Sequence, residues 1–406
     1  MLTTDRRRRW PLIVAVVVIA VLVATIAGWE IFVRSSRPPE PGPFYAVPSP
    51  LPEGPPGTLI RSEVIDEFMR GATAHRVLYK STGFDGEPTA VSGIIVVPDG
   101  APATEGRKVI AYTHGTVGVA SNCAPSLVTD PELQPLFFEG GAELLAAGYV
   151  IAATDYQGLG TPGPHPYLVG DADAMDALGS VRAARNLAEA RAGDEFVVWG
   201  HSQGGHASLF TGQLASRYAP ELRLRGVAAG GPVPDLEALF AANVKTTVGR
   251  TLIAMAIHSW ARVYEADLNQ VLTPVARPLV GRIAKNCLYN RNQILASIPA
   301  SLTLGLTFLR QPPWEIEPWR TILTTNRPGG APIEAPILLV QGDADRIVPI
   351  EATETLATNL CARGETVDLR VLTDIGHLAT SHEAVPDVIE WIASRFAGES
   401  PSTTCT

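Results

Sequence analysis

The sequence has 406 residues, 46% of them hydrophobic, so the chain is long enough to bury a large core and does not belong to the disordered class. Its net charge is −9, from 41 acidic and 32 basic residues. Binding to nucleic acid needs clustered Lys and Arg side chains, and the one dense basic run is Arg6 to Arg9. Composition therefore excludes a nucleic-acid partner and predicts a globular protein.

Residues 1–36 have the composition of an export segment. The run 12–29 is almost entirely apolar and follows the basic residues, an order typical of a segment whose positive flank stays in the cytoplasm. Thr25 and Ala27 form a small-residue cleavage site, so a cleaved signal peptide is one alternative. Because the apolar run continues through 31–33, we favour an uncleaved anchor that attaches the protein to a membrane through residues 12–29. Both alternatives place the rest of the chain outside the cytoplasm, either secreted or at the cell surface.

Residues 37–57, "RPPEPGPFYAVPSPLPEGPPG", are rich in Pro and Gly and cannot sustain a helix or a central strand. We expect this segment to be a semi-rigid linker, with the folded body beginning at residue 58. The body contains no internal repeat of about 20 to 50 residues, which excludes propellers and solenoids.

Apolar runs typical of strands alternate with stretches typical of helices along the body. The strand-like runs are 89–98, 108–115, 149–156, 195–200, 224–231, 336–342 and 368–374. The helix-like stretches are 132–147, 171–191, 203–218, 351–363 and 382–396. From residue 108 onward the strand runs are mostly continuous in hydrophobicity, as expected of strands covered on both faces. The pattern predicts an α/β protein with a mostly parallel, doubly wound sheet.

The alternation breaks over residues 233–334, where helical and loop-like sequence rich in Ala, Leu, Ile and Pro shows little strand pattern. We expect a helical insertion that divides the core into 58–232 and 335–406. One interpretation is a subdomain that only packs its own core. The other, which we favour, is a cap that covers an apolar site and selects substrates.

The exported body contains four cysteines, Cys123, Cys287, Cys361 and Cys405. An even number of cysteines in an oxidising compartment suggests two disulfides, for which three pairings exist. We prefer Cys361 with Cys405, which would fix the C-terminal tail, and Cys123 with Cys287, which would attach the insertion to the core. The cysteines lack metal-ligand spacing, and we predict no metal site and no cofactor.

The segment "FVVWGHSQGGHAS" at 196–208 places Gly-x-Ser-x-Gly between a strand-like and a helix-like stretch. This is the pattern of a nucleophile elbow, in which Ser202 occupies a tight turn and Gly200 and Gly204 leave room for it. An ordinary Gly-rich loop is the alternative, and the flanking strand and helix argue against it. Ser202 is therefore the candidate nucleophile.

A serine nucleophile needs a base and an acid, which follow it in the order Ser, Asp or Glu, His in this type of fold. The stretch "LLVQGDADRIVP" supplies Asp343 and Asp345 after a strand, and we favour Asp345, with Asp343 as a turn residue. The stretch "VLTDIGHLAT" supplies His377, which we expect on a loop. We expect the competing histidines to be structural: His75 before the sheet, His201 beside the serine, His206 in the next helix, His258 in the insertion and His382 on the last helix.

Acyl transfer also needs donors for the negative charge that develops on the carbonyl oxygen. The amide of Gln203, directly after the serine, is one candidate. The loop "AYTHGTVGVAS" at 111–121 follows an early strand and offers Gly115 and Thr116 as the second, without distinguishing between their amides. A plain Gly-containing turn is the alternative for this loop.

Residues 75–397 resemble the α/β-hydrolase superfamily. The segments "HGTVGVASNCAPS", "DYQGLGTPGPHPYLVG" and "WGHSQGGHASLF" together resemble the secretory lipase family, whose members are exported serine esterases with a helical cap. The resemblance implies that Asp155 and Tyr156 stand near the oxyanion loop and that "GPHPYLVG" shapes the rim of the site. From the residues alone, Asp155 could equally end a strand and cap the following turn.

We therefore expect an exported serine carboxylic ester hydrolase, a lipase or esterase that cleaves esters of apolar acyl chains through an acyl-enzyme. Its partner is an ester or lipid substrate. A peptidase or an acyltransferase of the same fold is an alternative, because the same residues support those reactions. A catalytically silent surface protein that uses the fold for binding is an alternative of another class.

Overall fold

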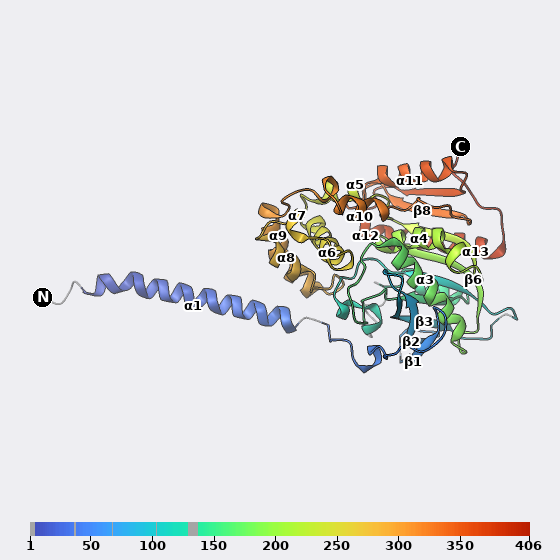
Figure 1. Cartoon of the computed structure of the whole chain (residues 1–406), viewed down its shortest axis with the longest axis horizontal. Coiled ribbons are helices and arrows are strands. Elements are labelled where there is room, and N and C mark those ends of the chain that lie inside the picture. The colour runs from blue at the N-terminus through green and yellow to red at the C-terminus, as the bar shows by residue number, and fades with distance from the viewer. Residues whose placement is uncertain (1–4, 36–37, 67, 103, 129–136) are drawn as a thin grey trace.

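The computed structural model of the protein describes residues 5–35, 38–66, 68–102, 104–128 and 137–406 (Figure 1). Within these ranges, nine strands form one sheet in the order β1-β2-β3-β5-β4-β6-β7-β8-β9. The strands are β1 (Leu59–Ile65), β2 (Ala72–Thr82), β3 (Pro88–Pro98), β4 (Arg107–Thr113), β5 (Val150–Thr154), β6 (Ala192–His201), β7 (Arg223–Gly230), β8 (Ile337–Gly342) and β9 (Val367–Leu372). The predicted α/β fold is confirmed.

The sheet is mixed at one edge and parallel elsewhere. The strands β1, β2, β3 and β5 pair antiparallel in succession, and β5, β4, β6, β7, β8 and β9 pair parallel. The predicted strands omit β1 and β2, so the expectation that His75 precedes the sheet is wrong: it lies in β2. The strand β1 alternates weakly and leaves much of its surface exposed, and β2 carries Arg76 and Lys80 within its apolar pattern.

Helices cover both faces of the sheet (Figure 1). Outside the insertion they are α2 (Gly141–Ala146), α3 (Gly170–Asn186), α4 (Gln203–Tyr218), α11 (Ile350–Ala362), α12 (His377–Glu383) and α13 (Val385–Ala397). On β4, Val109 and Ala111 contribute to the core under α3 and α4, whereas Ile110 and Tyr112 contribute to the core under α2 and α13. Successive side chains of a strand point to opposite faces, so a strand buried on both faces is continuously apolar.

Two helix predictions need adjustment, and one helix was missed. Part of the predicted helix 132–147 lies outside the described residues, and its described part is α2. The helix α12 was not predicted. It carries His382, which was expected on the last helix, while that helix begins at Val385.

Six helices lie between β7 and β8 and correspond to the predicted insertion. They are α5 (Leu236–Asn243), α6 (Thr247–Val263), α7 (Leu268–Val271), α8 (Ala276–Ile283), α9 (Arg291–Thr307) and α10 (Trp319–Thr325). They enclose their own apolar cluster, which includes Phe240, Trp260 and Trp319. Polar N-caps define several helix starts: the side chain of Asp235 accepts from the amide of Ala238 at α5. We call residues 233–334 the cap.

The apolar N-terminal segment forms α1 (Asp5–Ser35), which projects from the body (Figure 1). Its stretch Pro11–Val33 is long and apolar enough to cross a membrane, a test that an N-terminal signal sequence also passes.

Part of the Pro-rich segment, expected to be a semi-rigid linker, packs against the body. Tyr45 is buried, and its hydroxyl lies 2.9 Å from Oγ of Ser126. The guanidinium of Arg61 donates to the carbonyl oxygens of Pro43 and Phe44. Packed contacts with the body therefore begin before residue 58.

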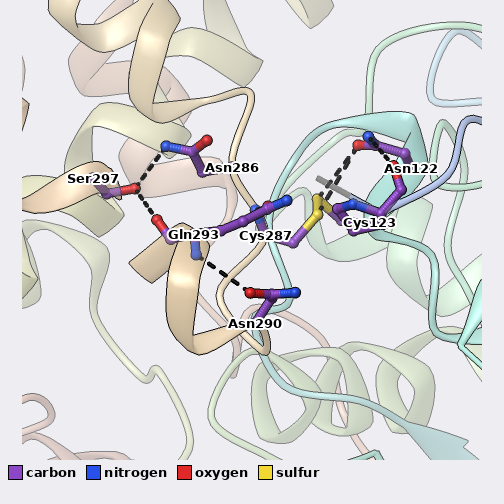
Figure 2. The surroundings of a disulfide bond; sticks show 8 residues. Asn122, Cys123, Asn286, Cys287, Asn290, Gln293 and Ser297 are labelled. Atoms are coloured by element: carbon purple, nitrogen blue, oxygen red, sulfur yellow. Dashed lines mark hydrogen bonds between the residues drawn. A yellow bond between two sulfur atoms is a disulfide. The ribbon is translucent and has the colours of Figure 1, made fainter. Parts of the chain in front are cut away.

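Two disulfides join Cys123 to Cys287 and Cys361 to Cys405, which confirms the preferred pairing. The first attaches the loop after β4 to the segment between α8 and α9 in the cap (Figure 2). Beside it, the amide of Cys287 donates to Oε1 of Gln293 at 2.6 Å. The second bridge holds the C-terminal tail against the edge formed by α11 and β9, where the amide of Thr404 donates to Val367 O.

Candidate active site

Ser202 lies between β6 and α4, on the turn that connects them. Its φ of 59° and ψ of −118° are in a region that residues other than glycine rarely adopt. The amide of Ser202 donates to Gly230 O at 2.8 Å, which ties the turn to β7. The geometry is that of the expected elbow.

The two glycines of the motif are required by the close approach of β4. A Cβ added to Gly204 would lie 1.9 Å from Thr113 O, and one added to Gly200 would lie 2.2 Å from the same oxygen. Both positions are therefore restricted to glycine by a backbone atom, which cannot rotate away as a side chain can.

The structure brings Ser202, His377 and Asp345 together. Nε2 of His377 lies 2.9 Å from Oγ of Ser202, and its Nδ1 lies 2.6 Å from Oδ2 of Asp345. Each of the three side chains follows a parallel strand (β6, β8 or β9), and the carboxyl ends of parallel strands meet at one edge of the sheet.

Asp345 is held by several donors besides His377. Its Oδ1 accepts from the amides of Ile347 and Val348, both at 2.8 Å, and its Oδ2 accepts from Nε2 of Gln341 at 2.9 Å. Burial alone would raise the pKa of Asp345, but the hydrogen bond and charge of His377 together with these amides hold that pKa below its ordinary value. The carboxylate therefore remains ionised beside the imidazole.

Asp343 lies apart from this group. It is exposed, and its Oδ1 accepts from the amide of Asp374 at 2.7 Å. It thus has the turn role expected of it.

His377 does not lie on a loop, in contrast to expectation. It is the first residue of α12, with Gly376 as N-cap. The helix begins immediately after the turn that follows β9, so the ring is fixed on an element instead of on flexible backbone.

Two of the competing histidines, His201 and His206, are buried beside the site. The ring of His201 is buried, with its centroid 4.7 Å from that of His377. Burial, and then the nearby His377, lower the pKa of His201 to about 3, so it packs against the imidazole as a neutral ring. His206 is buried in α4 and donates from Nε2 to Asn326 O at 2.8 Å.

The loop after β4 lies beside the elbow. A Cβ added to Gly115 would lie 3.3 Å from His201 O and 4.0 Å from the Cβ of Ser202. Gln203 is the first residue of α4, where the N–H groups have no partner within the helix. Thr116 also belongs to this loop, and its hydroxyl lies 2.9 Å from that of Tyr167. The three predicted oxyanion residues are therefore near Ser202 or on the loop that reaches it.

His114, which the sequence pattern did not single out, holds this loop. Its Nδ1 donates to Gly115 O at 2.7 Å, and its Nε2 lies 3.2 Å from Asp155 O. The hydroxyl of Tyr156 donates to His114 O at 3.2 Å. Asp155 and Tyr156 thus stand beside the loop, as the family resemblance implied.

The side chain of Asp155 also closes a buried turn. Its Oδ1 accepts from the amide of Ser126 at 2.9 Å, and its Oδ2 accepts from Oγ of Ser92 at 2.6 Å. The carboxylate of Asp155 therefore binds Ser92 on β3 and Ser126, whereas the alternative interpretation expected it to cap the turn that follows β5.

The side chain of Gln203 is anchored by a second unpredicted residue. Nδ1 of His165 donates to Gln157 O at 3.0 Å, which leaves Nε2 of His165 to accept from Nε2 of Gln203 at 3.4 Å. Burial lowers the pKa of His165 to about 3, so the ring stays neutral. The signal for this residue was the segment "GPHPYLVG", but its contact with Gln203 is not visible in sequence.

Comparison with known proteins agrees with this architecture. The family model described as "Secretory lipase" matches residues 141–404. Lipase A of Arthroderma benhamiae is 26% identical over 91% of this chain and 82% of its own length. "Probable inactive lipase MT1628" of Mycobacterium tuberculosis is 25% identical over 90% of this chain and 84% of its own length.

Among solved structures, lipase A of Candida antarctica superposes with a TM-score of 0.78 at 20% identity, covering 90% of this chain and 88% of that one. This likeness shows the fold. The family match extends over most of the chain, from the helix before β5 to the C-terminal tail, and includes the elbow and the residues around His377. The chain belongs to the secretory lipase family and is a carboxylic ester hydrolase of the lipase and esterase type.

Proposed function

We propose that the protein cleaves carboxylic esters as a serine hydrolase, with Ser202 as nucleophile, His377 as general base and acid, and Asp345 as the group that orients the imidazole. The observation that carries the proposal is the continuous contact from Asp345 through His377 to Ser202, with distances of 2.6 and 2.9 Å. A serine hydroxyl becomes nucleophilic when a base accepts its proton, and the ionised Asp345 stabilises the imidazolium that results.

The reaction has two halves. Oγ of Ser202 attacks the ester carbonyl carbon while Nε2 of His377 takes the hydroxyl proton, and collapse of the tetrahedral intermediate breaks the ester C–O bond as His377 returns the proton to the leaving alcohol. Water then attacks the acyl-enzyme, again giving its proton to His377. The second collapse releases the carboxylic acid and restores Ser202.

For the oxyanion we propose the amide of Gln203 and, from the loop after β4, that of Thr116. The carbonyl of Gly115 and the N–H of Thr116 belong to one trans peptide and point in opposite directions. Because the ring of His114 holds the carbonyl, the N–H of Thr116 is directed away from that ring. Gly115 contributes the space for a substrate to approach.

We further propose that the cap, residues 233–334, covers apolar acyl groups between the core segments 58–232 and 335–406. Similarity to proteins named lipases and the cap's own apolar cluster support this assignment. Export of the protein agrees with the family and with the apolar helix α1. Attachment through residues 12–29 remains a prediction.

The test is covalent labelling combined with turnover. The full chain, in a mild detergent, is treated with a serine-directed phosphonate and assayed on p-nitrophenyl esters from acetyl to palmitoyl. We expect Ser202→Ala to abolish labelling and to lower kcat by about a thousandfold or more. Ser394→Ala serves as the control, because the Ser394 hydroxyl donates to Trp391 O on α13. We expect this variant to retain labelling and kcat.

Labelling without ester turnover would instead favour a peptidase or an acyltransferase. Absence of labelling in the unmodified chain would favour a silent binding protein, a candidate raised by the relative described as probably inactive. Preference for long or short acyl chains separates lipase from esterase activity.

A further inference from the structure

A cavity of about 890 Å³ lies between the Pro-rich segment and the cap, and neither Ser202 nor His377 lines it. Residues 41–43, 45 and 46 form one wall, and the loops 119–121 and 160–163 form another. The cap contributes residues of α6 and of the end of α8. We call this the linker–cap cavity.

The linker–cap cavity is basic although the protein as a whole is acidic. Its lining includes His258, Arg262 and Lys285, and none of the described residues that line it is Asp or Glu. All three side chains line the same cavity, and burial together with the charges of Arg262 and Lys285 lowers the pKa of His258. Positive charge therefore converges here without an acidic residue in the walls.

The other residues that line the cavity favour a ligand with both charged and apolar parts over an inorganic ion. Pro41, Pro43, Val119 and Ala284 present apolar atoms beside the cations. A guanidinium and an ammonium are the groups that bind phosphate oxygens in proteins. The volume also exceeds that of a single phosphate, so there is room for a glycerol moiety.

The position of the cavity indicates that a phosphate bound there belongs to a membrane lipid. The helix α1 leaves the body on the side where α8 and α9 lie (Figure 1). The helix α9 packs against α8 and exposes Leu302 and Leu306, by 56% and 87%. The eight residue steps from Val33, where the apolar stretch ends, to Pro41 can span at most about 29 Å. A bilayer that held α1 would therefore lie close to the cavity.

We propose that the linker–cap cavity binds the phosphate headgroup of an anionic phospholipid. The headgroup oxygens contact Arg262 and Lys285, and the glycerol and first acyl carbons contact the apolar wall. This site is separate from Ser202 and does not depend on ester hydrolysis.

The test is calorimetric titration of the full chain carrying Ser202→Ala, which prevents turnover, in a non-ionic detergent. Dioctanoyl phosphatidylglycerol is compared with dioctanoyl phosphatidylcholine, inorganic phosphate and octanoate. We expect the phosphatidylglycerol to bind at least tenfold more tightly than the other three. Arg262→Gln with Lys285→Gln should weaken its binding at least tenfold.

Arg277→Gln with Arg282→Gln is the matched control, because it removes the same charge from α8 at positions that do not line the cavity. If both double variants weakened phosphatidylglycerol binding equally, the attraction would come from the overall positive charge of this region, and the proposed site would be overturned. If phosphatidylcholine or free phosphate bound as tightly as phosphatidylglycerol, the ligand would not be specifically an anionic phospholipid. If octanoate bound more tightly, the cavity would not recognise a phosphate headgroup. With Ser202 present, both double variants should keep the unmodified kcat on p-nitrophenyl butyrate, so failure of this proposal and failure of the proposed function are distinguishable.

Discussion

Ser202 combines a strained backbone with a crowded neighbourhood. A non-glycine residue in this conformation costs on the order of 1–3 kcal/mol, which the surrounding structure must offset. Part of the offset comes from the hydrogen bond of its amide to Gly230 O and from the tight packing of the elbow on β4. The elbow therefore tolerates little change at the positions that touch β4.

The substitution Gly204→Ala tests this restriction. Its Cβ would lie 1.9 Å from Thr113 O, and β4 is fixed between β5 and β6, so we expect loss of more than about 3 kcal/mol of stability and at least about a hundredfold loss of kcat. Gly330→Ala, where nothing lies within 4 Å, should change stability by less than about 0.5 kcal/mol. Denaturant unfolding measures the stability of both variants, and ester turnover measures their kcat. A stable, active Gly204→Ala enzyme would show that this position is not restricted to glycine.

The two aspartates after β8 give a matched pair for the proposed mechanism. Asp345→Asn removes the charge that faces Nδ1 of His377, and we expect kcat to fall about ten-thousandfold. Asp343→Asn retains an oxygen for the amide of Asp374 and should leave kcat within about twofold. Steady-state kinetics on p-nitrophenyl butyrate compares them, and similar losses in both variants would refute the assignment of Asp345.

At the level of single residues, the sequence predicts the candidate catalytic residues that lie within motifs. It does not predict the residues that hold them in position. Ser202, Asp345 and His377 were predicted as a group because each follows a strand in the order typical of the fold. His114 and His165 were missed as positioning residues because their partners, Asp155 and Gln203, are brought to them only by the sheet. No local pattern records such contacts.

Among the elements, the predicted strands include β3 to β9 and omit β1 and β2, the two antiparallel strands at one end of the sheet. The strands β4 to β8 read as apolar runs because helices cover both sides, whereas β1 is half exposed and carries polar residues. The helix α12 was missed because "HLATSHE" is short and only weakly apolar. Burial of Tyr45 was missed because Pro-rich sequence can pack without regular secondary structure.

The two disulfides act on different elements and should differ in effect. In the chain-entropy account, a separation of 164 residues contributes about 5 kcal/mol for Cys123–Cys287, and a separation of 44 contributes about 4 kcal/mol for Cys361–Cys405. We expect Cys123→Ser with Cys287→Ser to lower both stability and kcat, because that bridge holds the loop that carries Gly115 and Thr116. Cys361→Ser with Cys405→Ser should lower stability alone.

Denaturant unfolding and ester turnover of the two double variants separate these effects. Equal loss of kcat in both variants would show that the bridge near the loop has no particular influence on the site.

Across the whole molecule, the buried Asp176 and the buried His206 give stability opposite dependences on pH. Burial lowers the pKa of His206 to about 4 from its ordinary 6.5, so below pH 6.5 the unfolded state binds one proton more and stability falls as pH falls. Burial raises the pKa of Asp176 to about 7 from 3.8, so the folded state binds one proton more over that range and stability falls as pH rises.

Two variants isolate these dependences. Relative to the unmodified protein, His206→Gln should gain about 1.4 kcal/mol of stability per pH unit as pH falls from 6.5 to about 4. Asp176→Asn should lose about the same per unit as pH falls from about 7 to about 4. Urea unfolding at several pH values gives both slopes, and slopes of the same sign would contradict the burial of one group or the other.

The cap is joined to the sheet at two neighbouring strands. It leaves the core after β7 and returns at β8, which pairs with β7 in parallel, and the amide of Gly231 donates to Val340 O at 2.8 Å. The insertion thus leaves at the carboxyl end of β7 and returns at the amino end of the adjacent β8, where Ile337 pairs with Val227. An engineered exchange of the cap therefore needs only two junctions, one after β7 and one before β8, and leaves in place the strands that precede Ser202, Asp345 and His377.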